Sequence, residues 1–289
     1  MNVLSLFDGM SCGQIALNQL GIKVDNYFAS EIDRSAIEVS KSNFPKTIQV
    51  GDITNLKVEG LPKIDLLFGG SPCQSFSNAG NGTGFDGKSG LFWEFVRVLK
   101  ETKPKYFLLE NVKMRKEWKD IITEALGVEP ILINSKHFVP QNRERLYWTN
   151  IPVDEYSKTV DVKLDDILED NVSEHYYLTE KQLSKLDLNY KFSLNDIIRH
   201  KGGKHQQDNI YRSDGIMCCL SASSHGAARH LTKTLLPDGR LRRITESECE
   251  SLQSVPKDYT RVASSSKRYE MLGNGWTVDV IKHIFKNLK

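Results

Sequence analysis

The sequence predicts an α/β fold in which helices cover both faces of a mostly parallel β-sheet. Short apolar runs alternate with helix-like stretches through the first 150 residues, and this repetition is typical of such a fold. Residues 106–109 form a continuous apolar run, as expected of a buried parallel strand. Ligands of these sheets bind beyond the carboxyl ends of the strands, so the polar residues there are the first functional candidates.

The first region, residues 1–155, is predicted to form one domain. Strands are expected at residues 2–7, 26–30, 48–50, 64–68, 106–109 and 146–149. Helices are expected at residues 15–20 and 91–102, and Gly21 and Pro104 mark their ends.

The alternation is lost from about Tyr156. Residues 156–243 are rich in polar and small side chains, which predicts a separate small lobe without regular structure. Within it, Thr179 begins a capping-box pattern for one short helix. Residues 244–289 regain order, because Thr245 begins a second capping box and residues 278–288 fit an amphipathic helix.

The composition is that of an ordinary globular protein, with 39% hydrophobic and 26% charged residues and a net charge of +2. The charge is unevenly distributed. Between Asp196 and Arg243 there are nine Lys or Arg but four Asp. Such a basic field is expected where a protein meets phosphates. On charge alone, an ordinary solvated surface remains an alternative.

Five cysteines without a Cys-x-x-Cys pair argue against a disulfide framework and a structural zinc site, so no metal is expected. No apolar run reaches the roughly 18 residues of a membrane span. The first residues, MNVLSLFDG, lack the basic region of a signal peptide. We therefore expect a cytoplasmic protein that does not bind membranes.

The segment FDGMSCG, residues 7–13, is a turn between the first strand and helix, with glycines where a ligand can approach closely. Glu31 follows the next strand, where a carboxylate can accept hydrogen bonds from ribose hydroxyls. Asp52 follows the third strand and could accept from an adenine amino group. Either acid alone could be a solvated loop carboxylate. Together they favour an adenosine-containing cofactor.

Cys73 lies in the segment GGSPCQSFS, directly after a predicted strand. An isolated cysteine is usually a small buried hydrophobe. This one follows Pro72 and has glycines and polar residues around it, so we expect an exposed thiol that can react as a thiolate.

Glu110 ends the next predicted strand and is expected near Cys73, at neighbouring strand ends. Arg143 and Arg145 precede the strand at residues 146–149, and alternation would put both on one side of an extended segment. Such arginines are more often solvated or phosphate-binding than catalytic, so their meaning depends on the combination.

These motifs, in this order, resemble those of the DNA (cytosine-5)-methyltransferase family of bacterial or phage type. The similar segments are FDGMSCG, SPCQ, ENV, QNRER, RRITESECESLQSVP and GNGWTVDVI. They span nearly the whole chain except residues 156–240. The variants FDGMSCG and GNGW are similar to the animal de novo DNA methyltransferases.

The resemblance implies a Rossmann-like S-adenosylmethionine-dependent methyltransferase domain with a small target-recognition lobe inserted. Cys73 would add to C6 of a flipped-out cytosine in duplex DNA, and a methyl group would be transferred to C5. Glu110 would bind the N3/N4 edge of the base, Arg145 would hold O2, and Arg143 would help to position Glu110 or the loop.

The cofactor, S-adenosylmethionine with S-adenosylhomocysteine as product, would be bound at the strand ends and by the C-terminal motif. The residues implied are Phe7, Asp8, Gly9, Met10, Ser11, Cys12, Gly13, Glu31, Ile32, Asp52, Ile53, Gly70, Pro72, Leu91, Asn274 and Trp276.

Double-stranded DNA would be bound by the nucleophile loop and by basic residues of the lobe. The expected DNA-binding residues are Gln74, Ser75, Ser77, Arg199, Lys201, Lys204, Arg212, Arg229 and Lys233. A monomer is expected, with a separate restriction endonuclease as a potential partner.

Two alternatives remain within this fold: a tRNA cytosine-5 methyltransferase and a non-catalytic regulatory module. The first usually has a different tripeptide after Pro-Cys, and the second usually lacks the cysteine or the glutamate. A nicotinamide-dependent oxidoreductase would leave Cys73 and Glu110 without a role.

Overall fold

The computed structural model describes residues 1–72, 90–155, 160–187, 198–200, 209–222 and 233–288. The chain divides into two compact units. Unit 1 comprises Met1–Asn134, Glu144–Glu155 and Val278–Lys289, and unit 2 comprises Ser135–Arg143 and Tyr156–Thr277. Residues 244–277 thus cluster with unit 2, whereas the sequence-based division grouped them with the C-terminal segment.

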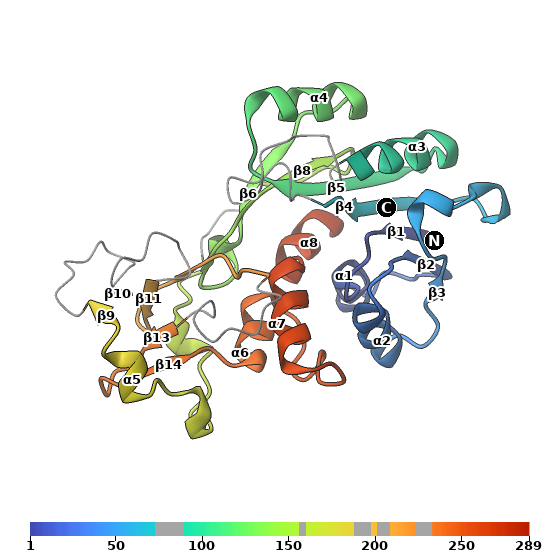
Figure 1. Cartoon of the computed structure of the whole chain (residues 1–289). Coiled ribbons are helices and arrows are strands. Elements are labelled where there is room, and N and C mark those ends of the chain that lie inside the picture. Colours follow the sequence, from blue (N-terminus) through green and yellow to red (C-terminus); the bar gives the residue numbers. More distant parts are fainter. Residues whose placement is uncertain (73–89, 156–159, 188–197, 201–208, 223–232, 289) are drawn as a thin grey trace. The chain divides into compact units, whose positions relative to one another are not determined.

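Unit 1 is built on a seven-stranded sheet with the order β3-β2-β1-β4-β5-β8-β6 (Figure 1). The first five strands in this order are parallel, and β8 pairs antiparallel with β5 and β6. The predicted mostly parallel α/β sheet is therefore confirmed. The strands are β1 (Asn2–Leu6), β2 (Asn26–Ser30), β3 (Ile48–Gln49), β4 (Leu66–Gly70), β5 (Tyr106–Val112), β6 (Ile131–Asn134) and β8 (Glu144–Thr149).

Helices cover both faces of this sheet. On one face, α3 (Phe92–Thr102) and α4 (Lys116–Leu126) share a buried apolar cluster with the strands. On the other, α1 (Cys12–Gln19) and α8 (Val278–Phe285) pack together, and the rings of Phe68 and Phe285 have centroids 5.5 Å apart (Figure 1). The C-terminal helix thus packs against α1 and β4.

The helices begin and end at recognisable residues. Asp33 caps α2 (Arg34–Asn43) by accepting from the amides of Ser35 and Ala36. Gly127 ends α4 in the left-handed conformation that favours glycine. Among the helices of the described residues, none has both the length and the hydropathy of a membrane span.

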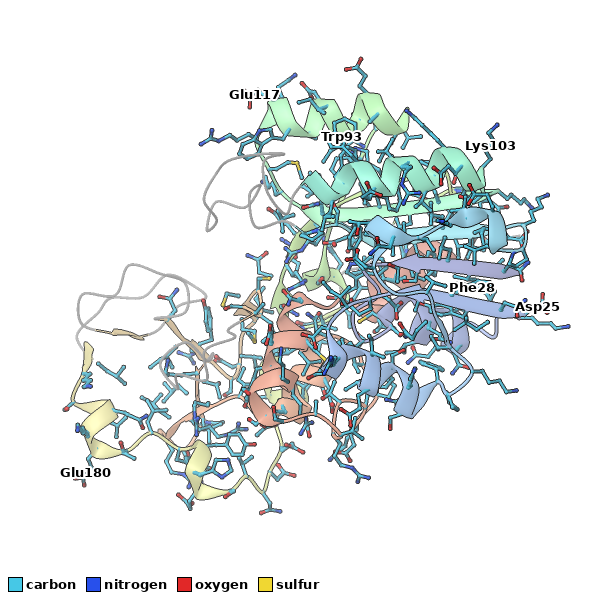
Figure 2. The ribbon with its side chains drawn as sticks, turned by 45° about the vertical axis from the view of Figure 1, so that its right-hand side comes forward. Asp25, Phe28, Trp93, Lys103, Glu117 and Glu180 are labelled. Atoms are coloured by element: carbon cyan, nitrogen blue, oxygen red, sulfur yellow. The ribbon has the colours of Figure 1, made fainter. Side chains whose placement is uncertain are left out.

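Strand β5 extends further than the sequence suggested. The apolar run ends at Leu109, but pairing with β8 continues through Val112, with Glu110 opposite Tyr147. Glu110 therefore lies inside the strand rather than beyond it. Asp25 at the start of β2 and Lys103 at the end of α3 mark the sheet edge opposite the strand ends that carry the site (Figure 2).

Unit 2 contains a five-stranded sheet with the order β14-β13-β11-β10-β9. The prediction that this lobe has no regular structure was therefore wrong. Its strands are β9 (Leu186–Asp187), β10 (Ile198–His200), β11 (Asn209–Arg212), β13 (Lys233–Leu235) and β14 (Leu241–Arg243). A small apolar cluster that includes Leu186, Ile210 and Leu241 supports it. Strands of two to four residues are too short to give a readable period.

The described part of unit 2 also contains a two-stranded sheet of β7 (Gln141–Asn142) and β12 (Met217–Cys218), and three α-helices. The helices are α5 (Glu180–Leu183), α6 (Glu246–Leu252) and α7 (Ser265–Asn274). Both predicted capping boxes are confirmed, at Thr179 and at Thr245. Short 3-10 turns occur at Ile53–Asn55 and Val58–Gly60 in unit 1, and at Ser135–His137, Leu164–Asp166 and Glu174–Tyr176 in unit 2.

Candidate active site

The carboxyl ends of β1, β2, β4 and β5 meet at one edge of the unit 1 sheet. Ser30 at the end of β2 lies beside Leu6 of β1, and Gly70 at the end of β4 lies beside Glu110 of β5. Phe28 of β2 is buried, whereas Trp93 of α3 is exposed (Figure 2). Glu31 and Glu110, two of the predicted functional residues, belong to this edge.

The β1–α1 turn, residues 7–11, has three residues with positive φ: Phe7 at 55°, Gly9 at 57° and Ser11 at 66°. This region is strained for residues with a Cβ, and such strain is often found at functional sites. A Cβ added at Gly9 would meet nothing within 4 Å, so the turn has open space on that side.

Asp8 anchors this turn. Its Oδ1 accepts from the Tyr27 hydroxyl at 2.7 Å, and its Oδ2 accepts from the Ser11 hydroxyl. Ser11 is in turn 2.6 Å from the Ser40 hydroxyl of α2. Burial raises the pKa of Asp8 from 3.8 to about 6, because desolvation disfavours the charged form more than these donors favour it.

Glu31 is held by three backbone amides. Its Oε2 accepts from Gly9 at 2.8 Å, and its Oε1 accepts from Ile32 at 2.7 Å and Asp33 at 2.8 Å. The turn and the carboxylate therefore fix each other. The adjacent Ile32 side chain is 71% exposed, which is unusual for isoleucine and leaves an apolar surface beside Glu31.

Asp52 accepts from the amide and the hydroxyl of Thr54 through one oxygen, Oδ1, at 2.9 Å in both cases. Ile53 is buried, and its carbonyl accepts from Arg97 at 2.9 Å. Two oriented carboxylates, an exposed aliphatic side chain and an open glycine turn fit a cofactor that carries a ribose and an adenine.

Several predicted cofactor residues are packed inside the protein. Met10, Ser11 and Cys12 are buried. A Cβ on Gly13 would lie 2.4 Å from the Phe68 ring, so this glycine allows α1 to pack closely on β4. These contacts give the four residues a packing function, and any cofactor contact from them stays a prediction.

The remaining predicted cofactor residues lie in different places. Gly70 ends β4, while Pro72 and Leu91 are half-buried on either side of residues 73–89, which lie outside the described residues. Asn274 and Trp276 belong to unit 2. Asn274 ends α7, and the neighbouring Gly273 fits against the backbone of Ser221 and Ala222, where a Cβ would be 2.5 Å away.

Glu110 and Arg145 form the charged pair of the site. Arg145 Nε lies 3.0 Å from Glu110 Oε1, and their side chains are 15% and 11% exposed. The pairing of β5 with β8 produces this contact, because Val112 lies opposite Arg145 in the sheet. A nearly buried carboxylate oriented by a guanidinium is suited to hydrogen-bonding a polar heterocycle edge.

Asn111 connects β5 to the segment that leads to Cys73. Its Nδ2 donates to the Ser71 carbonyl at 3.3 Å and to the Ser71 hydroxyl at 3.1 Å. Both residues are buried. Ser71 lies two residues before Cys73, so Asn111 fixes the start of the predicted nucleophile loop.

Arg143 was expected on the same side as Arg145, where it would help to position Glu110 or the loop. The structure gives it other partners. It is 3% exposed and belongs to unit 2. Its guanidinium donates to Gly273 O at 3.1 Å, Gly275 O at 2.8 Å and Leu220 O at 3.4 Å, and it lies 3.0 Å from Cys219 Sγ. These contacts make Arg143 a residue that fixes the Gly273–Gly275 turn.

Two of the predicted DNA-binding residues have described side chains. The Arg212 guanidinium is exposed and donates to both carboxylate oxygens of Asp214 at 2.6 Å. Lys233 is only 3% exposed on β13, so its burial argues against the expected phosphate contact.

Most of the other predicted residues of the DNA-binding and nucleophile regions belong to segments outside the described residues. Arg199 lies on β10, and its side chain is not described. The following residues lie outside the described residues: Cys73, Gln74, Ser75, Ser77, Lys201, Lys204 and Arg229.

Three buried polar residues with specific partners were not predicted from the sequence. Asn111 could have been identified from its place beside Glu110. Gln141 and Gln253 form a buried network in unit 2, in which Gln253 Nε2 donates to Leu272 O at 2.7 Å and Gln141 Nε2 donates to Leu252 O at 2.8 Å. Nothing in local sequence indicates those long-range partners.

Comparison with known proteins agrees with this geometry. A family model described as C-5 cytosine-specific DNA methylase matches residues 1–289. The orphan methyltransferase M.SPRI of Bacillus phage SPR is 33% identical over 426 residues, covering 100% of this chain and 97% of that protein. The type II methyltransferase M.HhaI of Haemophilus parahaemolyticus is 28% identical, covering 100% and 94%.

Solved structures share the fold. The Dnmt2 methyltransferase of S. pombe has a TM-score of 0.76 at 21% identity, covering 99% of this chain and 97% of that one. A putative DNA modification methyltransferase encoded within an E. coli prophage has a TM-score of 0.69 at 19% identity, covering 100% and 98%.

Proposed function

Because the chain belongs to the C-5 cytosine-specific DNA methylase family, we propose that Cys73, Glu110 and Arg145 carry out its reaction. The protein is a DNA (cytosine-5)-methyltransferase that uses S-adenosylmethionine. The observation that supports this assignment best is the Arg145–Glu110 contact of 3.0 Å, because Glu110 lies beside Gly70, the last residue of β4 before the segment leading to Cys73.

The proposed reaction begins at C6 of the cytosine. The Cys73 thiolate forms a sulfur–carbon bond at C6, and the electron pair of the C5–C6 double bond becomes available at C5. After methylation, C5 loses its proton to a base, the double bond forms again, and the bond between Cys73 and C6 breaks. The cysteine is regenerated, so each turnover consumes one methyl donor.

Glu110 and Arg145 would hold the cytosine while Cys73 attacks it. A protonated Glu110 can donate to N3 and also accept from the exocyclic amino group, and that contact draws electrons from the ring. Arg145 orients the Glu110 carboxyl and can also donate to O2 through its other guanidinium nitrogens.

The residues that would hold S-adenosylmethionine are those of the parallel strand ends. Glu31 is oriented to accept from ribose hydroxyls, Asp52 to accept from the adenine amino group, and Ile32 offers an exposed apolar surface to the base. The bound cofactor supplies the methyl group. Ile53, Leu91, Asn274 and Trp276 are further candidates from the resemblance.

The target cytosine must leave the duplex, which costs a few kcal/mol. Phosphate contacts are the usual means of holding DNA during such a step. The basic residues between Asp196 and Arg243 are the proposed source, and Arg212 is the one with a described, exposed guanidinium. We infer a monomer acting in the cytoplasm, with any restriction endonuclease acting as a separate protein.

Bisulfite sequencing of DNA from bacteria that express the protein tests this function. Cytosines of one sequence context should be protected from conversion, and Cys73→Ala should abolish the protection. Cys218→Ala, which changes a buried cysteine of β12, is the matched control and should retain it. Protection in transfer RNA but not in DNA would instead support an RNA substrate.

A further inference from the structure

The half-buried Asp8 lies in the β1–α1 turn, and its carboxylate is hydrogen-bonded to side chains of the protein. Asp8 contacts elements on every side of the turn: Tyr27 of β2 directly, Ser11 at the start of α1, and Ser40 of α2 through Ser11. The Asp8 amide also donates to Ser30 O at 3.1 Å. The carboxylate thus connects three elements, β2, α1 and α2, around residues 7–11.

The turn has a shape that requires such an anchor. Phe7 and Ser11 both have positive φ, although neither is glycine. Between them, the Gly9 amide donates to Glu31 Oε2 at 2.8 Å. A relaxation of the turn would move the Gly9 amide and release the carboxylate that is oriented for the ribose.

We propose that Asp8 is a positioning residue for cofactor binding, whose ionised carboxylate keeps residues 7–11 in the conformation that orients Glu31. This inference rests on the proposed cofactor site. Asp8 accepts from Tyr27, Ser11 and also Ser5, and the ionised form is purely an acceptor, which suits three hydroxyl donors. Protonation turns one oxygen into a donor and disrupts this arrangement.

The ionisation occurs in an accessible pH range. Burial raises the pKa of Asp8 to about 6, the hydroxyls of Ser11, Ser5 and Tyr27 oppose that rise, and the negative charge of Glu31 adds to it. Glu31 is therefore the charged group that faces Asp8. A cofactor with a sulfonium cation favours the ionised carboxylate, so its affinity should decrease as Asp8 gains a proton.

Isothermal titration calorimetry of S-adenosylmethionine and S-adenosylhomocysteine between pH 5 and pH 8 tests the proposal. If only the ionised form binds, the wild-type Kd should increase about 10-fold from pH 7 to pH 5, because about one molecule in ten is then ionised. Asp8→Asn should bind about 10-fold more weakly at pH 7.5 and show no pH dependence.

Two further variants separate positioning from general damage. Tyr27→Phe removes one donor, so the midpoint of its pH profile should move to higher pH. Asp65→Asn is the matched control: this half-buried aspartate accepts from the Asn2 amide at 2.7 Å, at the other end of β1. It should lower Tm and leave both the Kd and the pH profile unchanged.

The outcomes are distinguishable. A folded Asp8→Asn protein that binds as tightly as wild type, or keeps the wild-type pH profile, overturns the proposal. A folded wild-type protein that binds neither S-adenosylmethionine nor S-adenosylhomocysteine at pH 7.5 contradicts the proposed cofactor site itself.

Discussion

Replacing Asn111 with alanine should slow methyl transfer far more than it weakens binding of DNA or cofactor. The Asn111 amide nitrogen donates to Ser71 O and Oγ at 3.3 and 3.1 Å, and its Oδ1 accepts from the Val112 amide at 2.8 Å. Both of these hydrogen bonds to Ser71 come from the Asn111 side chain. Without it, the segment leading to Cys73 can move away from Glu110.

The size of the effect follows from these contacts. Leaving a buried polar group without its hydrogen bond costs about 1–3 kcal/mol, so the free energy of unfolding should decrease by about that amount. A displacement of a reacting group by about 1 Å can cost about 100-fold in rate. We therefore expect kcat to decrease about 100-fold, while KM for DNA and for S-adenosylmethionine changes less than about 3-fold.

Single-turnover methyl transfer to hemimethylated and unmethylated DNA measures the chemical step, and Ser71→Ala should show a smaller loss in the same direction. Asn150→Ala is the control, because Asn150 accepts from the Phe107 amide at 2.9 Å and donates to Lys105 O at 3.0 Å at the other end of β5. A wild-type rate in Asn111→Ala, or equal losses in both asparagine variants, would refute the reasoning.

Three further predictions concern stability. Glu248→Gln removes the carboxylate paired with the buried Arg242 and should lower the free energy of unfolding by about 3–5 kcal/mol in urea titrations; an unchanged midpoint would contradict this. Gly13→Ala should cost roughly 1–3 kcal/mol in thermal melts, because the Phe68 ring must move. Asp8 has a folded-state pKa raised from 3.8 to about 6, so its contribution to stability is largest below pH 3.8 and is lost as pH rises through 6. In urea titrations, Asp8→Asn should therefore gain more free energy of unfolding relative to wild type at pH 7.5 than at pH 5, by at most about 1.4 kcal/mol per unit of pKa shift.

Much of unit 1 could be predicted from sequence because its signals are local. Continuous apolar runs identified the buried parallel strands, and the carboxyl-end rule then indicated Glu31 and Glu110. The structure orients Glu31 toward the β1–α1 turn and pairs Glu110 with Arg145. The Glu110–Arg145 contact depends on the register between β5 and β8. The sequence pattern contains no direct information on which strand lies beside β5.

The arginines of the predicted QNRER motif have long-range partners. Arg143 and Arg145 are two positions apart, yet one donates to Gly273 and Gly275 and the other pairs with Glu110. Alternation along a strand predicts a common side only where pairing is continuous, and Arg143 lies between β7 and β8.

The sequence predicted a lobe without regular structure for a related reason. Its strands contain two to four residues, and pairing partners such as Leu186 and His200 are separated by residues with no apolar period. Lys233 was expected at the surface from its charge alone, whereas its strand lies between β11 and β14. Charge counts locate a basic region but do not show which side chains are exposed.

The central claim is that Cys73 attacks C6 of a cytosine in DNA. Incubation with duplex DNA that contains 5-fluorocytosine in the methylated context measures this directly, because fluorine at C5 cannot be lost as a proton and the covalent complex is trapped. With S-adenosylmethionine present, the wild-type protein should give a protein–DNA band that survives denaturation, and Cys73→Ala should give none. A band that persists in Cys73→Ala, or no band from folded wild-type protein that binds the cofactor and the DNA, would contradict the account.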